Sequence, residues 1–258
     1  MMTVFGCATI LALAAAPGPQ PEEARVTQAR PKPQLYAQAG AAKKGTPKKV
    51  PTTKSKAIPA AKANGAVALV AKVEGFYKNL QDYSAEFIQT YTRVALSKTS
   101  ESRGQIAIKK PGLMKWTYEK PAKKLWVVDG EKLWVEDPEE MQVFVDDNYK
   151  TTELTNSIQF LWGEGKLTDS FNATVGDAKT YEAPKGHEVL VLKPKRGASY
   201  AKLVLFVDSK TGAVQSSTIF ETSGNKNHFK FKAPKINAGM KASDFAYTPP
   251  KNFEVIHQ

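Results

Sequence analysis

The sequence has little sulfur and little imidazole, with one cysteine, Cys7, and three histidines in 258 residues. A single thiol forms no internal disulfide, so the folded part must be stabilised by its hydrophobic core. The histidines, His187, His228 and His257, have no metal-ligand spacing and no cysteine partners. The sequence therefore argues against a disulfide-stapled scaffold and a zinc site, and it indicates no metal and no cofactor.

The N-terminal apolar run, Val4 to Ala16, is too short to span a bilayer as a helix. It ends in small residues, and Ala14 to Ala16 fit an Ala-x-Ala cleavage site, so we predict an export signal peptide over residues 1–16. The stretch VFGC is similar to a lipoprotein cleavage box, but the apolar run follows Cys7 where it should precede it. This order argues against lipidation of Cys7.

Residues 17–63 lack an amphipathic period and hold ten basic residues against two acids, Glu22 and Glu23. They are rich in Pro, Ala, Gln and Lys, a composition that buries too little apolar area to offset the entropy of ordering. Residues 64–258 keep 27 Lys and Arg against 23 Asp and Glu, so the net charge falls from +12 to +4. We predict a solvated basic tail, and contact with anionic headgroups or peptidoglycan stays open. No nucleic-acid-binding motif accompanies it, so nucleic acid is not an expected partner.

The pattern changes at residue 64, where we place the start of a single folded domain over residues 64–258. Apolar residues then recur at steps of three and four, which predicts an amphipathic helix over residues 66–81. Its apolar positions are Val67, Val70, Val73, Phe76, Tyr77 and Leu80.

After this helix the apolar period changes to two, which predicts strands. Two sets of turn residues separate apolar runs in the way that hairpins require, Asp129-Gly130 and Thr211-Gly212. The expected strands cover residues 84–94, 103–110, 114–119, 124–129, 132–137, 141–146, 171–177, 187–193, 201–208, 213–222 and 227–233. Eleven strands joined mostly by short turns predict an antiparallel meander that curls into a barrel or half-barrel.

Two apolar segments stand out within this meander. In KKPGLMKWTYEKP, residues 109–121, Met114, Trp116 and Tyr118 fall on alternate positions and so share one face of a strand. That face either fills a core or lines a cavity for an apolar ligand. Residues 154–162 lack strand alternation and predict a short apolar helix, a candidate plug for the mouth of the barrel.

Residues that could support catalysis are few. Ser199 and Lys202 match an S-x-x-K pattern, but they lie at the start of a strand and lack the partner motifs. The glycines Gly163 and Gly165 lack the strand-turn-helix context of a phosphate loop, and residues 146–148 read as a turn. We therefore predict no catalytic residues and no enzyme, and the aromatic and aliphatic faces become the candidate site, although packing alone explains most single aromatics.

Four blocks now carry a resemblance: YSAEFIQT, GQIAIKKPGLMKWTYEKP, VVDGEKLWVEDP and FAYTPPKNFEV. In this order and spacing, over about residues 66–256, the chain resembles the periplasmic outer-membrane lipoprotein carrier family, LolA. The resemblance implies a mainly β fold, an incomplete antiparallel β-barrel of about eleven strands closed by a helical lid. It also implies a periplasmic monomer that receives acylated lipoproteins from an inner-membrane ABC transporter, holds their acyl chains in a hydrophobic cavity, and delivers them to an outer-membrane acceptor.

The resemblance also assigns roles to single residues. An arginine of the family, whose hydrogen bonds hold the lid shut, matches Lys110, a departure that implies a weaker or different lock because lysine lacks the planar fork. The acyl cavity or its rim is expected to be formed by Met114, Trp116, Leu113, Tyr118 and Phe87. The lid is expected to contain Ile158, Phe160, Leu161 and Trp162.

Three alternatives stay open at this point. A carrier of the same fold could take another lipid or a glycolipid. The outer-membrane acceptor relative, LolB-like and itself a lipoprotein, would need a proper lipidation box, which the sequence around Cys7 does not provide. A non-catalytic envelope-tethering protein would use the basic tail and would leave the barrel empty.

Overall fold

The computed structural model describes residues 60–149 and 165–257, with only the helical assignment for residues 60–63. Twelve strands follow one another in this part of the chain: β1 (Asp82–Arg93), β2 (Lys98–Lys109), β3 (Leu113–Lys120), β4 (Lys124–Val128), β5 (Leu133–Asp137), β6 (Gln142–Asp146), β7 (Phe171–Gly176), β8 (His187–Pro194), β9 (Tyr200–Asp208), β10 (Val214–Glu221), β11 (Lys226–Ile236) and β12 (Glu254–His257). The helices are α2 (Ala60–Lys78), η1 (Val94–Leu96), α4 (Leu167–Ser170) and η4 (Ala242–Phe245). Among these helices, none is both long and apolar enough to cross a bilayer.

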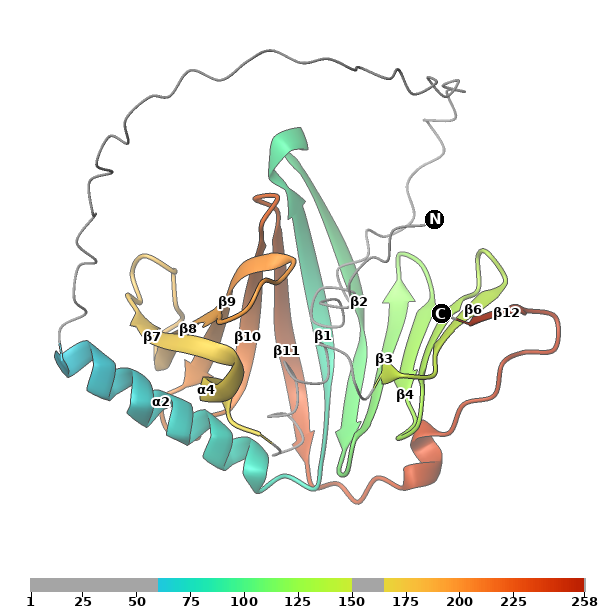
Figure 1. The fold of residues 1–258 in the computed structure, drawn as a ribbon, viewed down its shortest axis with the longest axis horizontal. Helices are drawn as coiled ribbons and strands as arrows, with labels where there is room; N and C mark the ends of the chain where they lie inside the picture. The colour runs from blue at the N-terminus through green and yellow to red at the C-terminus, as the bar shows by residue number, and fades with distance from the viewer. Residues whose placement is uncertain (1–59, 150–164, 258) are drawn as a thin grey trace, which may run out of the picture.

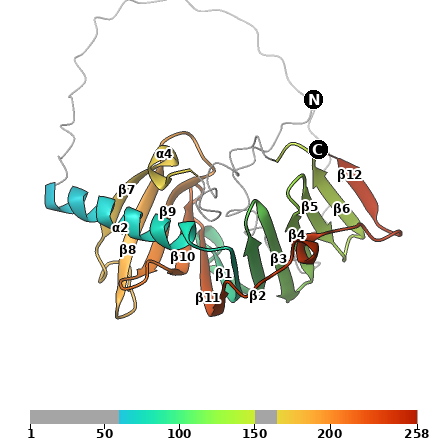
Figure 2. The ribbon, with the colours of Figure 1, turned by 90° about the horizontal axis from the view of Figure 1, so that it is seen from below.

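All twelve strands form one open sheet in the order β12-β6-β5-β4-β3-β2-β1-β11-β10-β9-β8-β7 (Figure 1). Figure 2 shows the strands along an arc, with α2 in front of the half that holds β8 to β10. The predicted incomplete antiparallel barrel is confirmed as a curved open sheet that does not close.

One strand was not predicted. β12 pairs with the edge strand β6 in parallel, with Val255 opposite Val143, whereas β1 to β11 pair antiparallel. Its four residues are too few to show a period, and its partner lies more than 100 residues earlier in the chain. Only the return of the chain along the sheet brings the two together.

Helix α2 begins at Ala60, earlier than the predicted start of both helix and domain, and it ends at Lys78 instead of residue 81. The amides of Asn79 and Leu80 donate to the carbonyls of Phe76 and Tyr77 at 3.3 and 3.2 Å, which tightens the last turn. The apolar period itself continues to Leu80, but the chain must turn there to enter β1. The helix end is therefore set by the following strand.

Strand alternation divides the side chains between two faces of the sheet. The inner face carries the main core, which joins residues from β1 to β5 and β7 to β11 to the apolar side of α2. The buried α2 residues of this core are Leu69, Val70, Val73 and Tyr77. The hydrophobic core on the inner face therefore extends through both halves of the curved sheet.

The outer face is also covered in two places. On the outer face of β8 and β9, a second hydrophobic cluster packs against Tyr181. It consists of Val189, Val191, Val204 and Phe206. The other place lies over β3 to β5, where the chain returns between β11 and β12.

This return segment, residues 237–253, is fixed at both ends by side chains. Asp82 accepts hydrogen bonds from the amides of Ala238, Gly239 and Met240 at 2.7, 3.0 and 3.2 Å. Farther along, Phe245 is buried beside β3, and the Tyr247 hydroxyl donates to Glu136 at 2.6 Å. The segment therefore covers the outer face of β3 to β5, opposite the apolar inner face of the same strands.

Candidate functional site

The candidate site is the inner face around β3. Met114, Trp116 and Tyr118 alternate along this strand and are all buried, as the period of two predicts. Phe87 on β1 lies against two of them, with ring centroids 5.0 Å from Trp116 and 4.9 Å from Tyr118. Four of the five predicted cavity residues therefore lie together.

The fifth predicted cavity residue, Leu113, does not belong to this group. It is the first residue of β3 and alternates to the face opposite Met114, where its Cδ2 atom approaches Gly130. It is absent from the inner-face core. Leu113 therefore does not share the face of Met114, because neighbouring residues on a strand point to opposite faces, and its place at the cavity rim stays a prediction.

The aromatic surface continues onto β11. The Phe229 ring lies 5.3 Å from Trp116 and 5.9 Å from Phe87, and Phe231 lies 6.4 Å from Trp116. Gly104 makes this packing possible, because a Cβ atom there would come within 2.9 Å of the Phe87 ring. We call Phe87, Trp116, Tyr118, Phe229 and Phe231 the aromatic block.

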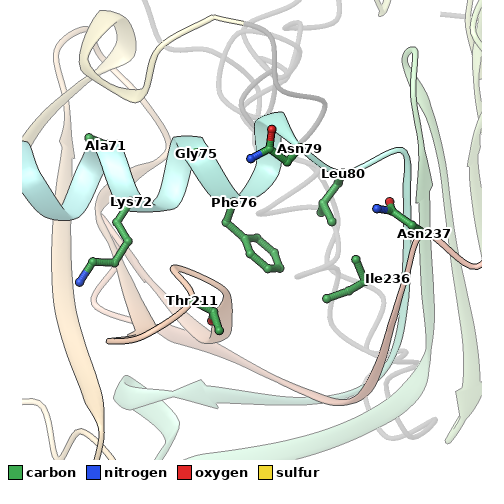
Figure 3. A pocket seen from close by; sticks show the side chains of 9 residues that line it. All are labelled: Ala71, Lys72, Gly75, Phe76, Asn79, Leu80, Thr211, Ile236 and Asn237. Carbon is green, nitrogen blue, oxygen red and sulfur yellow. The ribbon is translucent and has the colours of Figure 1, made fainter.

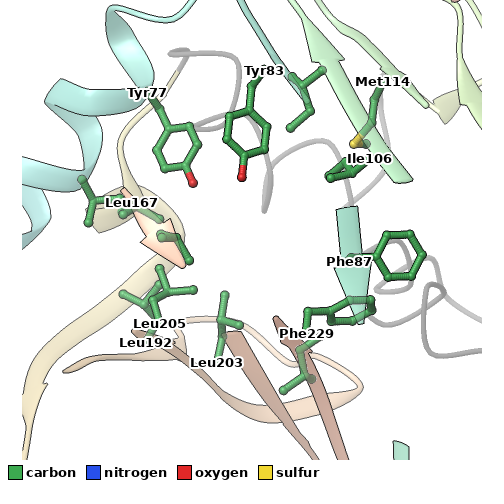
Figure 4. Close-up of a cluster of buried hydrophobic side chains, with 14 of the residues drawn as sticks. Tyr77, Tyr83, Phe87, Ile106, Met114, Leu167, Leu192, Leu203, Leu205 and Phe229 are labelled. Carbon is green, nitrogen blue, oxygen red and sulfur yellow. The ribbon is translucent and has the colours of Figure 1, made fainter. Parts of the chain in front are cut away.

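Aliphatic side chains extend the surface into the other half of the arc. Figure 4 shows Leu192, Leu203 and Leu205 pointing toward the same interior as Ile106 and Met114 from the opposite half. The register explains this, because Leu192 pairs with Leu203 across β8 and β9. The inner face therefore offers a largely apolar lining, with aromatic rings on one side and leucines on the other, and with the buried polar pair Gln89 and Asn227 beside the rings.

Two tyrosines close this interior near α2. Burial raises the pKa of Tyr83 to about 12, and burial, together with the charge of Tyr83, raises the pKa of Tyr77 well above its ordinary value. Both hydroxyls are therefore neutral at physiological pH, and neither brings a charge into the apolar lining.

Helix α2 is held over the sheet by polar contacts at its sides. Lys110, at the end of β2, donates from Nζ to the carbonyl oxygens of Tyr77 and Lys78 at 2.7 and 2.8 Å. A positive charge beside the last carbonyls of a helix also complements the helix dipole. The residue that matches the family's lid-holding arginine thus binds the C-terminal turn of α2.

Two further contacts hold the middle of α2. Lys72 donates to Glu188 at 3.0 Å and to the carbonyl of Ser209 at 2.9 Å. Glu74 accepts a hydrogen bond from the amide of Leu167, the first residue of α4, at 2.7 Å. The helix is tied to β8, to the β9–β10 turn and to α4.

A groove of about 390 Å³ lies between α2, the β9–β10 turn and the end of β11 (Figure 3). It was not predicted, because its walls come from three separate parts of the chain. Its lining residues are Ala71, Lys72, Gly75, Phe76, Asn79, Leu80, Thr211, Ile236 and Asn237. It lies beside the helix, apart from the β3 aromatic block.

The predicted lid residues, Ile158, Phe160, Leu161 and Trp162, lie outside the described residues. The same holds for the predicted signal peptide over residues 1–16 and for the tail up to residue 59. These assignments stay predictions.

A match to known proteins covers most of the sheet. Residues 78–248 match the family model described as Outer membrane lipoprotein carrier protein LolA. A protein of Dechloromonas aromatica named outer-membrane lipoprotein carrier protein is 31% identical over 187 residues, which cover 72% of this chain and 86% of that protein. A protein of the same name from Pseudomonas aeruginosa is 26% identical over 191 residues, covering 74% of this chain and 88% of that protein.

Among solved structures, a LolA superfamily protein from Nitrosomonas europaea aligns with a TM-score of 0.40 at 13% identity, over 70% of this chain and 97% of that one. The Mycobacterium tuberculosis lipoprotein LppX aligns with a TM-score of 0.41 at 10% identity, over 69% of this chain and 98% of that one. The family model covers more than half of the chain, and it spans every strand of the sheet except β12. The chain belongs to the LolA family of outer membrane lipoprotein carrier proteins.

Proposed function

We propose that this protein is a periplasmic carrier that binds the acyl chains of lipoproteins against the inner face of its sheet. It receives them from an inner-membrane ABC transporter and passes them to an outer-membrane acceptor. It acts by binding and release, without catalysis and without a cofactor. Family membership supports the class of cargo, and export by residues 1–16 supplies the compartment.

The largely apolar lining of the inner face carries this proposal. Burying one methylene group contributes about 0.8 kcal/mol, so an acyl chain of roughly fifteen methylenes gains about 12 kcal/mol when fully desolvated. Release of such a chain into water would be very slow. The cargo must therefore move directly from one apolar surface to another.

The lining is closed in the structure, since Met114 is 3% exposed and Phe87 is 1% exposed. A bound acyl chain must replace some of the present contacts, and the elements over the inner face must move to admit it. The polar contacts of Lys110 and Lys72 along α2 are few and lie at its margin. Opening would break these contacts and would also expose the buried α2 side chains Leu69, Val70, Val73 and Tyr77, so burial of the cargo must offset both.

The experiment is native mass spectrometry of the mature protein after export and co-expression with a tri-acylated lipoprotein. We expect a one-to-one complex with the wild type and none with Met114→Glu, because a carboxylate on the inner face would have to be desolvated with the acyl chain. Thr117→Glu is the matched control, since it introduces the same charge on the same strand but on the outer face.

Four other outcomes are informative. Loss of the complex with both variants would point to a general effect on folding, which circular dichroism would reveal. An unchanged complex with Met114→Glu would contradict the proposed cavity. A free lipid or glycolipid in place of the lipoprotein would favour a general lipid carrier, and an empty protein would favour the tethering role.

A further inference from the structure

The inner face contains two buried hydrogen-bond donors that lack an acceptor. Among the described residues, no partner lies within hydrogen-bond distance of Trp116 Nε1 or Asn227 Nδ2. Both residues are buried, with exposed fractions of 6% and 0%. Nearly all buried polar groups in folded proteins are paired, so two unpaired donors on one face require an explanation.

Both groups lack the same kind of partner. An indole N–H can only donate, so the missing partner of Trp116 is an acceptor. Asn227 already uses its Oδ1 atom, which accepts from Gln89 Nε2 at 3.0 Å, and this leaves its own N–H group unsatisfied. A ligand that satisfies them must present oxygen acceptors and need carry no donor.

The two donors lie on the same face at different levels of the sheet. Asn227 pairs with Tyr91 on β1, whereas Trp116 is level with Ala85 on that strand, through Ile106 of β2. Asn227 and Phe229 are two residues apart on β11 and point to the same side, a spacing of about 7 Å. The Phe229 ring is 5.3 Å from Trp116, so Phe229 packs against one donor residue and is the next inward-facing residue of β11 from the other. Each donor therefore calls for an acceptor of its own. Aromatic faces accept hydrogen bonds only weakly, so the surrounding block does not replace a carbonyl oxygen.

We infer that Trp116 and Asn227 are two separate donors to carbonyl oxygens of the acyl groups, one within the aromatic block and one beside it, so that the site selects ester- or amide-linked acyl chains over alkyl chains. The inference rests on the proposed function and names the part of the cargo that the face recognises. Methylene groups offer no acceptor, whereas an ester or amide carbonyl has two lone pairs. A carbonyl bound by Trp116 then lies beside Phe229, and its chain extends toward the leucines of β8 and β9.

Matched ester and ether ligands test this inference directly. One pair is a dipalmitoylated lipopeptide and its dihexadecyl ether analogue, and the other is 1-palmitoyl-lysophosphatidylcholine and its 1-O-hexadecyl analogue. The members of each pair differ in the carbonyl groups alone. For the full mature chain, titration calorimetry is expected to show the ester bound about three- to tenfold more tightly than the ether, the effect of one or two buried hydrogen bonds.

The variant that tests the donor is Trp116→Phe, which keeps an aromatic ring and removes the N–H. We expect its ester-to-ether affinity ratio to fall toward one, and any preference that remains is due to Asn227. Trp126→Phe is the control, because Trp126 lies directly opposite Trp116 on β4 with the same 6% exposure. Its N–H is not among the buried unpaired donors, so its ratio should equal that of the wild type. Asn227→Leu removes the second donor and gives an independent test if Trp116→Phe does not fold.

Equal affinities for ester and ether in the wild type would overturn the inference while leaving an acyl-binding carrier in place. A preference kept undiminished by both Trp116→Phe and Asn227→Leu would equally overturn it. Failure of all four ligands to bind would instead contradict the proposed function. A preference seen with the lipopeptide alone assigns the two donors to lipoprotein cargo, and a preference in both pairs assigns them to acyl carbonyls in general.

Discussion

Lys110 Nζ lies 2.7 Å from the carbonyl oxygen of Tyr77, and this contact joins the end of β2 to the last turn of α2. Tyr77 in turn directs its side chain into the interior (Figure 4). A polar contact at the surface thereby fixes the position of a helix that covers the apolar lining. Its loss should loosen the helix more than the sheet.

Replacement of Lys110 by methionine should lower the free energy of unfolding by about 1–2 kcal/mol, because two helix carbonyls lose a charged donor. Urea denaturation measures this loss, and amide hydrogen exchange in the last turn of α2 should become faster. Lys110→Arg should retain most of the stability, since its fork also reaches carbonyl groups. The control Lys109→Met removes a charge from the neighbouring residue and should change stability by less than about 0.5 kcal/mol. Equal effects of Lys110→Met and Lys109→Met would contradict a specific contact.

Gly212 in the β9–β10 turn should not tolerate a side chain. Its φ is +84°, and a Cβ atom would come within 2.4 Å of the Lys72 carbonyl oxygen on α2. Gly224 has a similar φ of +89° with nothing within 4 Å, so Gly224→Ala measures the backbone strain alone. We expect a loss of about 1 kcal/mol for Gly224→Ala and roughly 2–4 kcal/mol for Gly212→Ala, from urea midpoints. Similar losses of stability in the two variants would show that α2 moves away from the turn at no cost.

The ion pair of Lys72 and Glu188 should contribute little by itself. Both side chains are partly exposed, at 37% and 42%, and exposed pairs contribute about 0–1 kcal/mol. A double-mutant cycle with Lys72→Met and Glu188→Gln should give a coupling energy in this range. The single change at Lys72 should cost more than the coupling energy, because it also removes the donor to the Ser209 carbonyl. A coupling energy above about 2 kcal/mol would mean that this ion pair is a main stabilising contact of α2.

Stability should fall as the pH rises from about 10 to 12. The pKa of Tyr83 is raised by burial from 10.0 to about 12, so in this window the unfolded chain releases a proton that the folded chain keeps. The contribution is fully present below pH 10 and is lost toward pH 12, an amount of about 2–3 kcal/mol.

Unfolding in urea at pH 9, 10 and 11 tests this slope. Tyr83→Phe removes the titrating hydroxyl and should show a shallower fall with pH than the wild type. An unchanged slope in Tyr83→Phe would mean that other groups cause the alkaline loss.

Several features of the site follow from local pattern. The alternation of Met114, Trp116 and Tyr118 predicted one shared face because a strand has a period of two, whatever its neighbours. The same rule, applied to Leu113, would have placed it on the other face. Turn chemistry at Gly130, which adopts a φ of +99°, likewise needs only nearby residues.

Other features had no local signal. Lys110 was identified by position in a motif, but its acceptors lie on a helix more than 30 residues earlier. The four residues of β12 gain their structure from β6. The unpaired N–H of Trp116 depends on which acceptors the fold leaves out of reach, and no sequence pattern encodes that.

The sequence by itself determined the strands, most hairpins and the apolar character of one face, because these depend on backbone geometry and on the spacing of side chains along the chain. Only the tertiary structure decided where α2 ends, which carbonyls Lys110 binds, how β12 pairs and which buried donors lack a partner. These depend on contacts between segments that are far apart in the chain. Their energies arise only when the sheet curves and brings those segments together.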